Sequence, residues 1–247
     1  MRAHDFTFTA SDEKAIRVHA WLPDAAPPRG ILLVAHGMAE HATRYARLAT
    51  ALAASGWAVY APDHRGHGET AGPGELGWLA EKDGFRRVVL DLHEIAGTAV
   101  AECDGAPLFL FGHSLGSLLA EAYLGAYGAV PPLLAGCALS GLIEPPPAGL
   151  LAIARCLAGV GCLLKGQKAK APLLDRLSFG AMNRAFLPVK TKFDWLSRDA
   201  AEVDAYVADP LCGFVCTDGY FRDFLAGFSY VYGGPLAGGK AGALDAI

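Results

Sequence analysis

The residues best suited to chemistry lie in one short turn, Gly112-His113-Ser114-Leu115-Gly116. The apolar run PLFLF precedes it and a helical pattern follows, which is the strand–turn–helix setting of a G-x-S-x-G nucleophile turn. Such a turn strains the backbone of the serine and leaves no room for side chains at the flanking glycines. It also lifts the hydroxyl to a helix N-terminus, where developing negative charge is favoured. The turn therefore predicts Ser114 as the nucleophile of acyl transfer.

A second glycine turn follows the apolar residues GILLVA and reads HGMAEH over residues 36–41. Acyl transfer needs two donors aimed at the oxyanion of the tetrahedral intermediate. We expect these to be the backbone N–H groups of Met38 and of Leu115, the residue after the nucleophile. His36 and His41 are alternatives as a general base. Histidines beside a glycine turn usually fix the loop by hydrogen bonding, and we prefer that interpretation.

A third polar turn, DHRGHG at residues 63–68, follows the apolar residues WAVYAP. Three titratable types of side chain on one turn are compatible with a proton relay or a metal site. The simpler interpretation is structural, with an Asp63–Arg65 pair and glycines that fix a tight turn at the edge of a sheet. We favour the structural interpretation.

The residues between these turns alternate between strand and helix patterns. Apolar runs predict buried strands at residues 30–35, 57–62, 107–112 and 133–140, and alternation predicts another at Ala15–Leu22. Apolar residues at three- and four-residue steps predict helices at residues 44–55 and 85–99 and at Leu115–Tyr127. Strands that alternate with amphipathic helices predict an α/β fold, with a mostly parallel sheet and helices on both sides.

The pattern changes after Glu144, where three consecutive prolines cannot continue a helix or an interior strand. Residues 145–232 contain helical segments and loops but no convincing buried strand. Residues 233–247 are rich in Gly and Ala and are typical of a linker or terminal segment. We therefore expect the core at residues 1–144, a helical cap at residues 145–232, and a linker or truncated end at residues 233–247.

The composition excludes some classes of protein. Of the 247 residues 53% are hydrophobic and 19% charged, and the net charge is −4, so the chain can bury a large core. It has no cluster of Lys and Arg that would bind a nucleic acid. Residues 1–21 alternate polar and apolar side chains and lack the long apolar core of a secretory signal. We expect a cytoplasmic protein.

The six cysteines are consequently expected to be reduced thiols. Cys212 and Cys216 are closely spaced, but no histidine follows them and no second pair has a spacing typical of zinc ligands. We expect no metal.

The three turns, taken in order, resemble those of a known family. HGMAEH followed by Arg44-Tyr45, then DHRGHG and then GHSLG are similar to the monoacylglycerol lipase and lysophospholipase group of α/β-hydrolases, which includes serine aminopeptidase-like sequences. DWLSRD at residues 194–199, with DPLC at 209–212, resembles the cap of bacterial members. The resemblance covers nearly the whole chain.

This resemblance implies an eight-stranded core, a cap that accommodates lipid and no cofactor. It also implies hydrolysis of the carboxylic ester of a monoacyl lipid, a monoacylglycerol or a lysophospholipid, through an acyl-enzyme at Ser114. Thioesterase and aminopeptidase activities stay open. The apolar residues 150–164 fit a cap that receives an acyl chain or touches a membrane surface, and a buried helix explains them as well. They are shorter than the ~20 residues of a membrane span.

The sequence departs from the family at the catalytic triad, which in this fold runs Ser, then Asp or Glu, then His. All histidines precede Ser114: His4, His19, His36, His41, His64, His67, His93 and His113. Glu144 follows the predicted strand at residues 133–140, a position where some relatives place the acid, but we expect the triad acid and histidine to be absent from this chain. We expect a C-terminally truncated hydrolase that is inactive alone, with residues 133–140 as an uncovered sheet edge. The alternative is a complete, non-catalytic protein that binds a lipid-like ligand.

Overall fold

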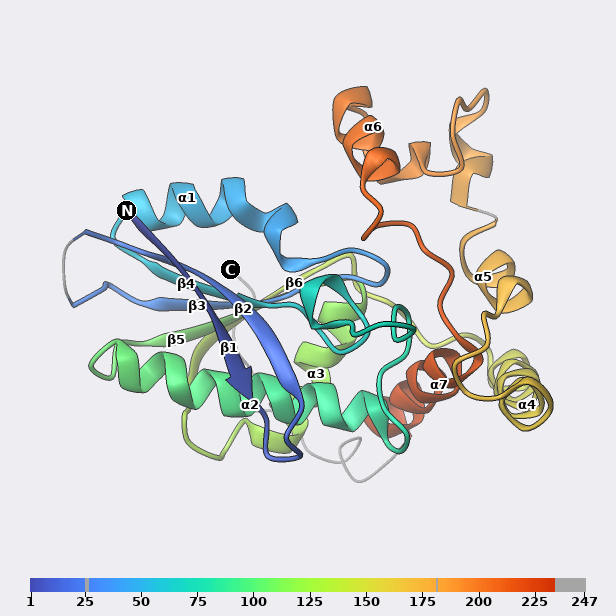
Figure 1. Ribbon diagram of the computed structural model, residues 1–247, viewed down its shortest axis with the longest axis horizontal. Coiled ribbons are helices and arrows are strands. Elements are labelled where there is room, and N and C mark those ends of the chain that lie inside the picture. The colour runs from blue at the N-terminus through green and yellow to red at the C-terminus, as the bar shows by residue number, and fades with distance from the viewer. Residues whose placement is uncertain (25–26, 181, 234–247) are drawn as a thin grey trace.

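The computed structural model describes residues 1–24, 27–180 and 182–233, and it contains a six-stranded sheet flanked by helices (Figure 1). The strands are β1 (Arg2–Thr9), β2 (Ala15–Leu22), β3 (Ile31–Ala35), β4 (Ala58–Pro62), β5 (Leu108–His113) and β6 (Leu134–Ser140). The α-helices are α1 (Ala46–Ala54), α2 (Gly84–Glu102), α3 (Leu115–Tyr127), α4 (Ala148–Lys165), α5 (Pro172–Phe179), α6 (Ala200–Ala208) and α7 (Asp218–Tyr232). Short 3-10 helices are η1 (Ala42–Tyr45), η2 (Gly68–Thr70), η3 (Met182–Phe186) and η4 (Asp194–Leu196).

The strand order is β1-β2-β4-β3-β5-β6, in which β4, β3, β5 and β6 are parallel and β1 and β2 are antiparallel. The predicted α/β architecture is confirmed, and the predicted strands and helices of the first half lie within a few residues of the observed ones. Within the described residues the sheet has six strands, where the resemblance implies eight. Because parallel strands share one carboxyl edge, the turns after β3, β4 and β5 lie next to one another.

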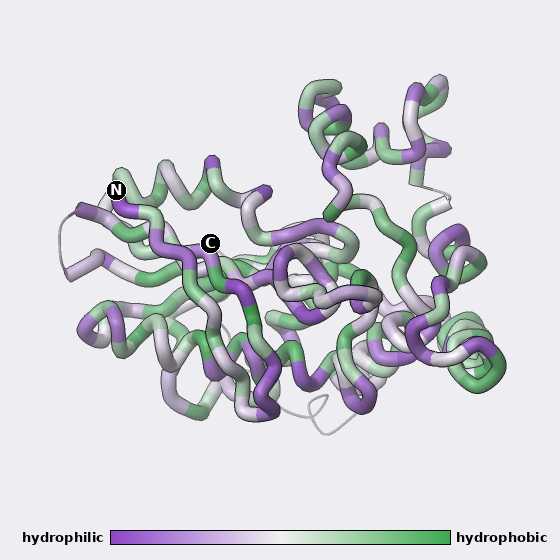
Figure 2. Tube along the Cα trace, viewed as in Figure 1, coloured by the Kyte–Doolittle hydropathy of each residue, from purple (hydrophilic) through white to green (hydrophobic). Residues whose placement is uncertain are grey.

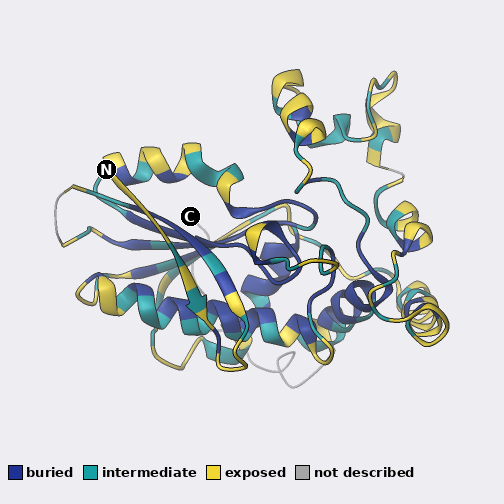
Figure 3. Cartoon of the chain, in the orientation of Figure 1, coloured by how far each residue is buried: buried dark blue, intermediate teal, exposed yellow. Residues whose placement is uncertain are grey.

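Helices cover both faces of this sheet (Figure 1). On one face α2 and α3 pack against the strands, and their buried side chains, such as Leu92 and Leu118, belong to the larger core. On the other face α1 packs over β4 through Ala49 and Ala53 in a smaller core. The burial colouring of Figure 3 shows the buried residues concentrated on the inner strands β2, β4, β3 and β5 and on the sheet-facing sides of these helices, whereas β1 is largely exposed.

The predicted cap, residues 145–232, contains helices and no named strand in its described part. In Figure 1, α4, α5 and α6 gather beyond the carboxyl edge of the sheet. Helix α7 differs from them, because it contacts α2 and α3 and places Tyr220, Phe221 and Phe224 in the larger core. The division at residue 145 stays a prediction, and α7 packs as part of the core layer. Residues 234–247, most of the predicted linker, lie outside the described residues.

The polar turn after β4 is built differently from the prediction. Arg65 is 3% exposed and donates to Asp91 of α2, with Nε 2.6 Å from Oδ2, and to Asp12. Asp63 instead accepts from the backbone N–H groups of Ala42 and Glu69, at 2.8 and 2.7 Å. The predicted Asp63–Arg65 pair is wrong, because each group finds its partners on other segments. The hydrogen bonds from Arg65 lower the pKa of Asp12 to about 2.

Three histidines are buried at the ends of β3 and β4. The ring of His36 lies 3.9 Å from that of His64 and 5.2 Å from that of His67, measured between centroids. Burial disfavours the charged imidazolium and lowers the pKa of all three, to about 3 for His67. The folded protein therefore keeps these rings neutral.

Replacing Arg65 by Met should destabilise the protein by about 3 kcal/mol, because it leaves the buried carboxyl of Asp91 without its partner. Arg47→Met is the matched control, since the Arg47 side chain is 85% exposed and its pair with Glu202 lies at the surface. That variant should lose less than about 0.5 kcal/mol. Urea unfolding measures both losses, and equal losses would contradict the assigned role of Arg65.

The buried histidines should make the protein less stable in acid. An unfolded histidine binds a proton near its ordinary pKa of about 6.5, whereas folded His67 does so near 3. Stability is thus fully present above pH 6.5 and falls as the pH drops toward 3. The free energy of unfolding should fall between pH 7.5 and 5.5, and His67→Phe should make this fall smaller by about 1 kcal/mol. The control is His4→Phe, at an exposed position, which should leave the size of the fall unchanged. Urea unfolding at both pH values is the measurement.

Candidate active site

Ser114 lies between β5 and α3 in an unusual backbone conformation, with φ 54° and ψ −116°. A non-glycine residue at positive φ is strained and persists only where its surroundings fix it. Here the N–H of Ser114 donates to the carbonyl of Ser140 at 2.9 Å, and its own carbonyl accepts from the N–H and hydroxyl of Ser117. The strained serine at the start of a helix is the geometry of a nucleophile turn.

The flanking glycines are required by lack of space. A Cβ on Gly112 would overlap the carbonyl oxygen of Gly116, and a Cβ on Gly116 would overlap that of Ala35 at the end of β3. The turn after β5 is thus packed directly against the neighbouring strand. The same close packing brings the loop after β3 to the nucleophile, where a Cβ on Gly37 would lie 3.4 Å from the Cβ of Ser114.

Met38 and Leu115 follow Gly37 and Ser114 and are the predicted oxyanion donors. Within the part of the chain that the structure describes, neither backbone N–H has a hydrogen-bond acceptor. Free N–H groups on the two turns that meet at Ser114 are what an oxyanion hole requires. The assignment of Ser114, Met38 and Leu115 to these roles stays a prediction.

Glu40 is a site residue that the sequence analysis missed. Its carboxylate is 8% exposed and accepts from the N–H of Gly37 at 2.5 Å, from the hydroxyl of Tyr45 at 2.7 Å and from Nε of Arg44 at 3.0 Å. Burial alone would raise the pKa of Glu40, but the hydrogen bonds from Tyr45 and Gly37 outweigh burial and lower it. The sequence signal was an acid inside a glycine turn that follows a buried strand. Its role is to hold the loop that carries Met38.

The histidines near this loop are occupied by structural contacts. His36 donates from Nδ1 to the carbonyl of Gly37 at 2.8 Å and accepts at Nε2 from the N–H of His64 at 2.9 Å. His41 lies 2.7 Å from Asp209 through Nε2 and 2.9 Å from Thr43 through Nδ1. Both rings fix the loop by hydrogen bonding, as the sequence analysis expected.

The general base has no candidate among these rings. In residues 1–24, 27–180 and 182–233, no histidine is hydrogen-bonded to the hydroxyl of Ser114. His113 is next to Ser114 in sequence, but its Nδ1 contacts the hydroxyl of Ser140 at 3.1 Å. Glu144 is exposed.

His41, Asp209 and Cys212 place three potential metal-ligand atoms within 4.8 Å of one another. Both ring nitrogens of His41 already have hydrogen-bond partners. Burial raises the pKa of Cys212 to about 12, so in the metal-free protein its sulfur is a thiol. We interpret the group as a hydrogen-bonded cluster, and the absence of a metal stays a prediction.

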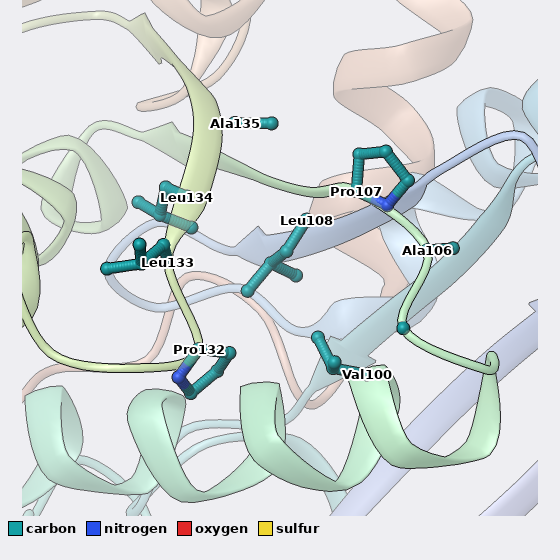
Figure 4. A pocket seen from close by; sticks show the side chains of 9 residues that line it. Val100, Ala106, Pro107, Leu108, Pro132, Leu133, Leu134 and Ala135 are labelled. Atoms are coloured by element: carbon teal, nitrogen blue, oxygen red, sulfur yellow. The ribbon is translucent and has the colours of Figure 1, made fainter.

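An apolar pocket of about 340 Å³ lies far from this site (Figure 4). It is formed at the amino ends of β5 and β6, by residues that include Val100, Leu108, Pro132 and Leu133. Ser114 lies at the opposite, carboxyl edge of the same strands. This pocket therefore does not serve the candidate nucleophile.

The chain is similar to lipases in sequence. Residues 26–233 match the family described as Serine aminopeptidase, S33. A monoacylglycerol lipase of Mycolicibacterium smegmatis is 36% identical over 192 residues, which cover 77% of this chain and 59% of that protein. A monoglyceride lipase of Homo sapiens is 30% identical over 198 residues, which cover 77% of this chain and 54% of that protein. The chain thus spans little more than half the length of these curated relatives.

Solved structures are similar in fold. A thermostable carboxyl esterase from Bacillus coagulans, crystallised with glycerol, has a TM-score of 0.81 at 29% identity, over 94% of this chain and 74% of that chain. A monoglyceride lipase from Saccharomyces cerevisiae, with a substrate analogue, has a TM-score of 0.67 at 20% identity, over 94% and 69% of the two chains. The second likeness is one of fold alone. The predicted resemblance is confirmed, and the chain belongs to the serine aminopeptidase S33 family of α/β-hydrolases.

Proposed function

We propose that this chain carries the nucleophile and the oxyanion hole of a serine hydrolase that cleaves carboxylic esters of monoacyl lipids. The observation that supports this most is the strained backbone of Ser114, with φ 54°, at the start of α3 and beside the Gly37-Met38 loop. A strained serine at this place has no structural need to be serine. It serves chemistry by presenting its hydroxyl at a helix N-terminus.

In the proposed reaction the Ser114 oxygen attacks the ester carbonyl carbon while its proton passes to a general base. The carbonyl oxygen becomes an oxyanion, which accepts hydrogen bonds from the N–H groups of Met38 and Leu115. Collapse of the tetrahedral intermediate releases the alcohol, which takes the proton, and leaves an acyl group on Ser114. Water then attacks the acyl-enzyme by the same steps. The proposal assigns the base to no described residue.

The substrate class rests on relatives that are named monoacylglycerol and monoglyceride lipases. Other chemistry uses the same nucleophile and oxyanion hole, because acyl-thioesters and amides also pass through an oxyanion. The family description favours amide cleavage as the second candidate. Comparing a monoacylglycerol, a lysophospholipid, an acyl-thioester and an aminoacyl amide as substrates separates these candidates.

Reaction with a fluorophosphonate, followed by mass spectrometry, tests the nucleophile. We compare the 247-residue chain with a fusion to the part of the Mycolicibacterium smegmatis relative that follows its matched residues. Because an unassisted serine is a weak nucleophile, the chain alone should react slower by at least about a thousandfold, and the fusion should react at Ser114. The Ser114→Ala fusion is the control.

An unreactive but folded fusion would count against catalysis and favour the alternative, a lipid-binding member of the family. Rapid labelling of Ser114 in the chain alone would mean that a described residue supplies the base, which would overturn the expectation that the chain is inactive alone.

We further propose that α4 rests on a lipid surface, as the predicted membrane contact requires. This helix has 18 residues and a mean hydropathy of 1.7, so by length and composition it could cross a bilayer. Only 11% of its residues are buried. Figures 2 and 3 show it apolar and exposed at the edge of the molecule. However, it packs against α7, and Arg155 donates to Ser229 of α7 at 2.9 Å, so α4 is attached to the core layer through α7. A position of α4 on the membrane surface fits these contacts better than a position across the membrane. The cytoplasmic location of the protein stays a prediction.

Changing Leu163 and Leu164 together to Glu should weaken binding to phosphatidylcholine–phosphatidylglycerol vesicles by at least about tenfold. These side chains are 84% and 76% exposed, so the change leaves the core intact. The matched control changes Leu133 and Leu142 to Glu as well. These two side chains are 58% and 59% exposed and lie beside β6, away from α4. Vesicle sedimentation measures binding, and equal losses in both variants would argue against a surface role of α4.

A further inference from the structure

The carbonyl oxygen of Ala39 is held by two donors from the predicted cap. The hydroxyl of Tyr206, on α6, donates to it at 2.7 Å, and the backbone N–H of Gly213 donates at 2.9 Å. Tyr206 is 5% exposed and lies 167 residues away in sequence. Ala39 directly follows Met38, the predicted oxyanion donor. The cap therefore contacts the backbone of the oxyanion loop itself.

Ala39 needs such support, because its φ of 55° is in the left-handed region. In this region the Cβ of alanine is crowded, and only glycine adopts it without strain. A loop released from its partners would therefore relax to another conformation. The two hydrogen bonds to its carbonyl oppose that relaxation.

The loop is clamped on both sides of Met38. On one side the N–H of Gly37 donates to the buried carboxylate of Glu40. On the other side the carbonyl of Ala39 accepts from the cap. The Met38 N–H lies on the peptide unit between these two anchors, so its direction depends on both of them.

Further contacts join the same two segments. His41 pairs with Asp209 at 2.7 Å, and the Arg44 guanidinium lies 4.8 Å from the centre of the Tyr206 ring. Gly213 has a φ of 63°, and a Cβ there would lie 2.6 Å from the ring of Phe193. The segment that donates to Ala39 is thus itself closely packed.

We propose that the cap sets the oxyanion hole, with Tyr206 and Gly213 as positioning residues that hold Ala39 in its left-handed conformation and so aim the Met38 N–H at the substrate. The effect on the reaction rests on the proposed function of Ser114. When the cap lies on the loop, the hole is formed. When the cap moves away, both donors leave the Ala39 carbonyl and the hole relaxes.

The test compares Tyr206→Phe with Tyr220→Phe, which removes a buried hydroxyl that has no hydrogen-bond partner among the described residues. The first readout needs no catalysis: amide hydrogen exchange of the peptide that covers residues 37–41. Losing one hydrogen bond to the loop should speed its exchange about three- to tenfold in Tyr206→Phe, and leave it unchanged in Tyr220→Phe. Unchanged exchange in Tyr206→Phe would overturn the proposal, whatever the chemistry shows.

The second readout is the rate of fluorophosphonate labelling at Ser114, in the chain and in the fusion described above. Tyr206→Phe should slow the labelling step about three- to tenfold with little change in probe binding. Adding Ala39→Gly should restore part of that rate, because glycine adopts the left-handed conformation without help. Urea unfolding of the single and double variants separates this effect from a change in overall stability, because relief of strain at residue 39 also stabilises the fold.

The outcomes separate this proposal from the proposed function. If Ser114 is labelled neither in the unmutated chain nor in the unmutated fusion, the proposed hydrolase function fails. Hydrogen exchange then still tests whether Tyr206 holds the loop at Ala39. Labelling that is unaffected by Tyr206→Phe, or not restored by Ala39→Gly, would overturn the positioning role while leaving the nucleophile in place.

Discussion

A lack of space between two parallel strands governs the site. The turn after β5 lies so close to the end of β3 that a side chain at Gly116 would overlap the carbonyl oxygen of Ala35. Only a turn with glycines on both sides of Ser114 fits there, and that turn forces the serine to a φ of 54°. The strain of Ser114 and its closeness to the loop over residues 36–41 thus follow from the same steric constraint.

The loop over residues 36–41 links this constraint to the rest of the molecule. Its first half is held by the buried ring of His36, which bonds to the Gly37 carbonyl, and by the carboxylate of Glu40. Its second half is held by Tyr206 and Gly213, which donate to the carbonyl of Ala39. The loop over residues 36–41 has backbone groups that do not take part in the sheet. Polar contacts, most of them buried, bind these groups and fix the loop.

The buried charged groups near the site all have partners, because a buried charge without one is costly. Arg65 reaches Asp91 on α2 and Asp12 after β1, so it joins three segments beneath the polar turn. Asp63 accepts from two backbone N–H groups and stabilises the turns around it. Neither group is left for chemistry. The hydroxyl of Ser114, the proposed nucleophile, has no such structural partner among the described residues.

The sequence alone determined the strand and helix pattern, the Ser114 turn and the family, because apolar periodicity and the need for glycine in tight turns act over a few residues. The tertiary structure decided which groups meet. The partner of Arg65 is Asp91 rather than Asp63, Glu40 is the anchor of its loop, α7 joins the core, and Tyr206 contacts Ala39 across 167 residues. These contacts join segments far apart in the chain, and they depend on how the sheet stacks its strands and on where the cap returns to it. No local pattern encodes such distances.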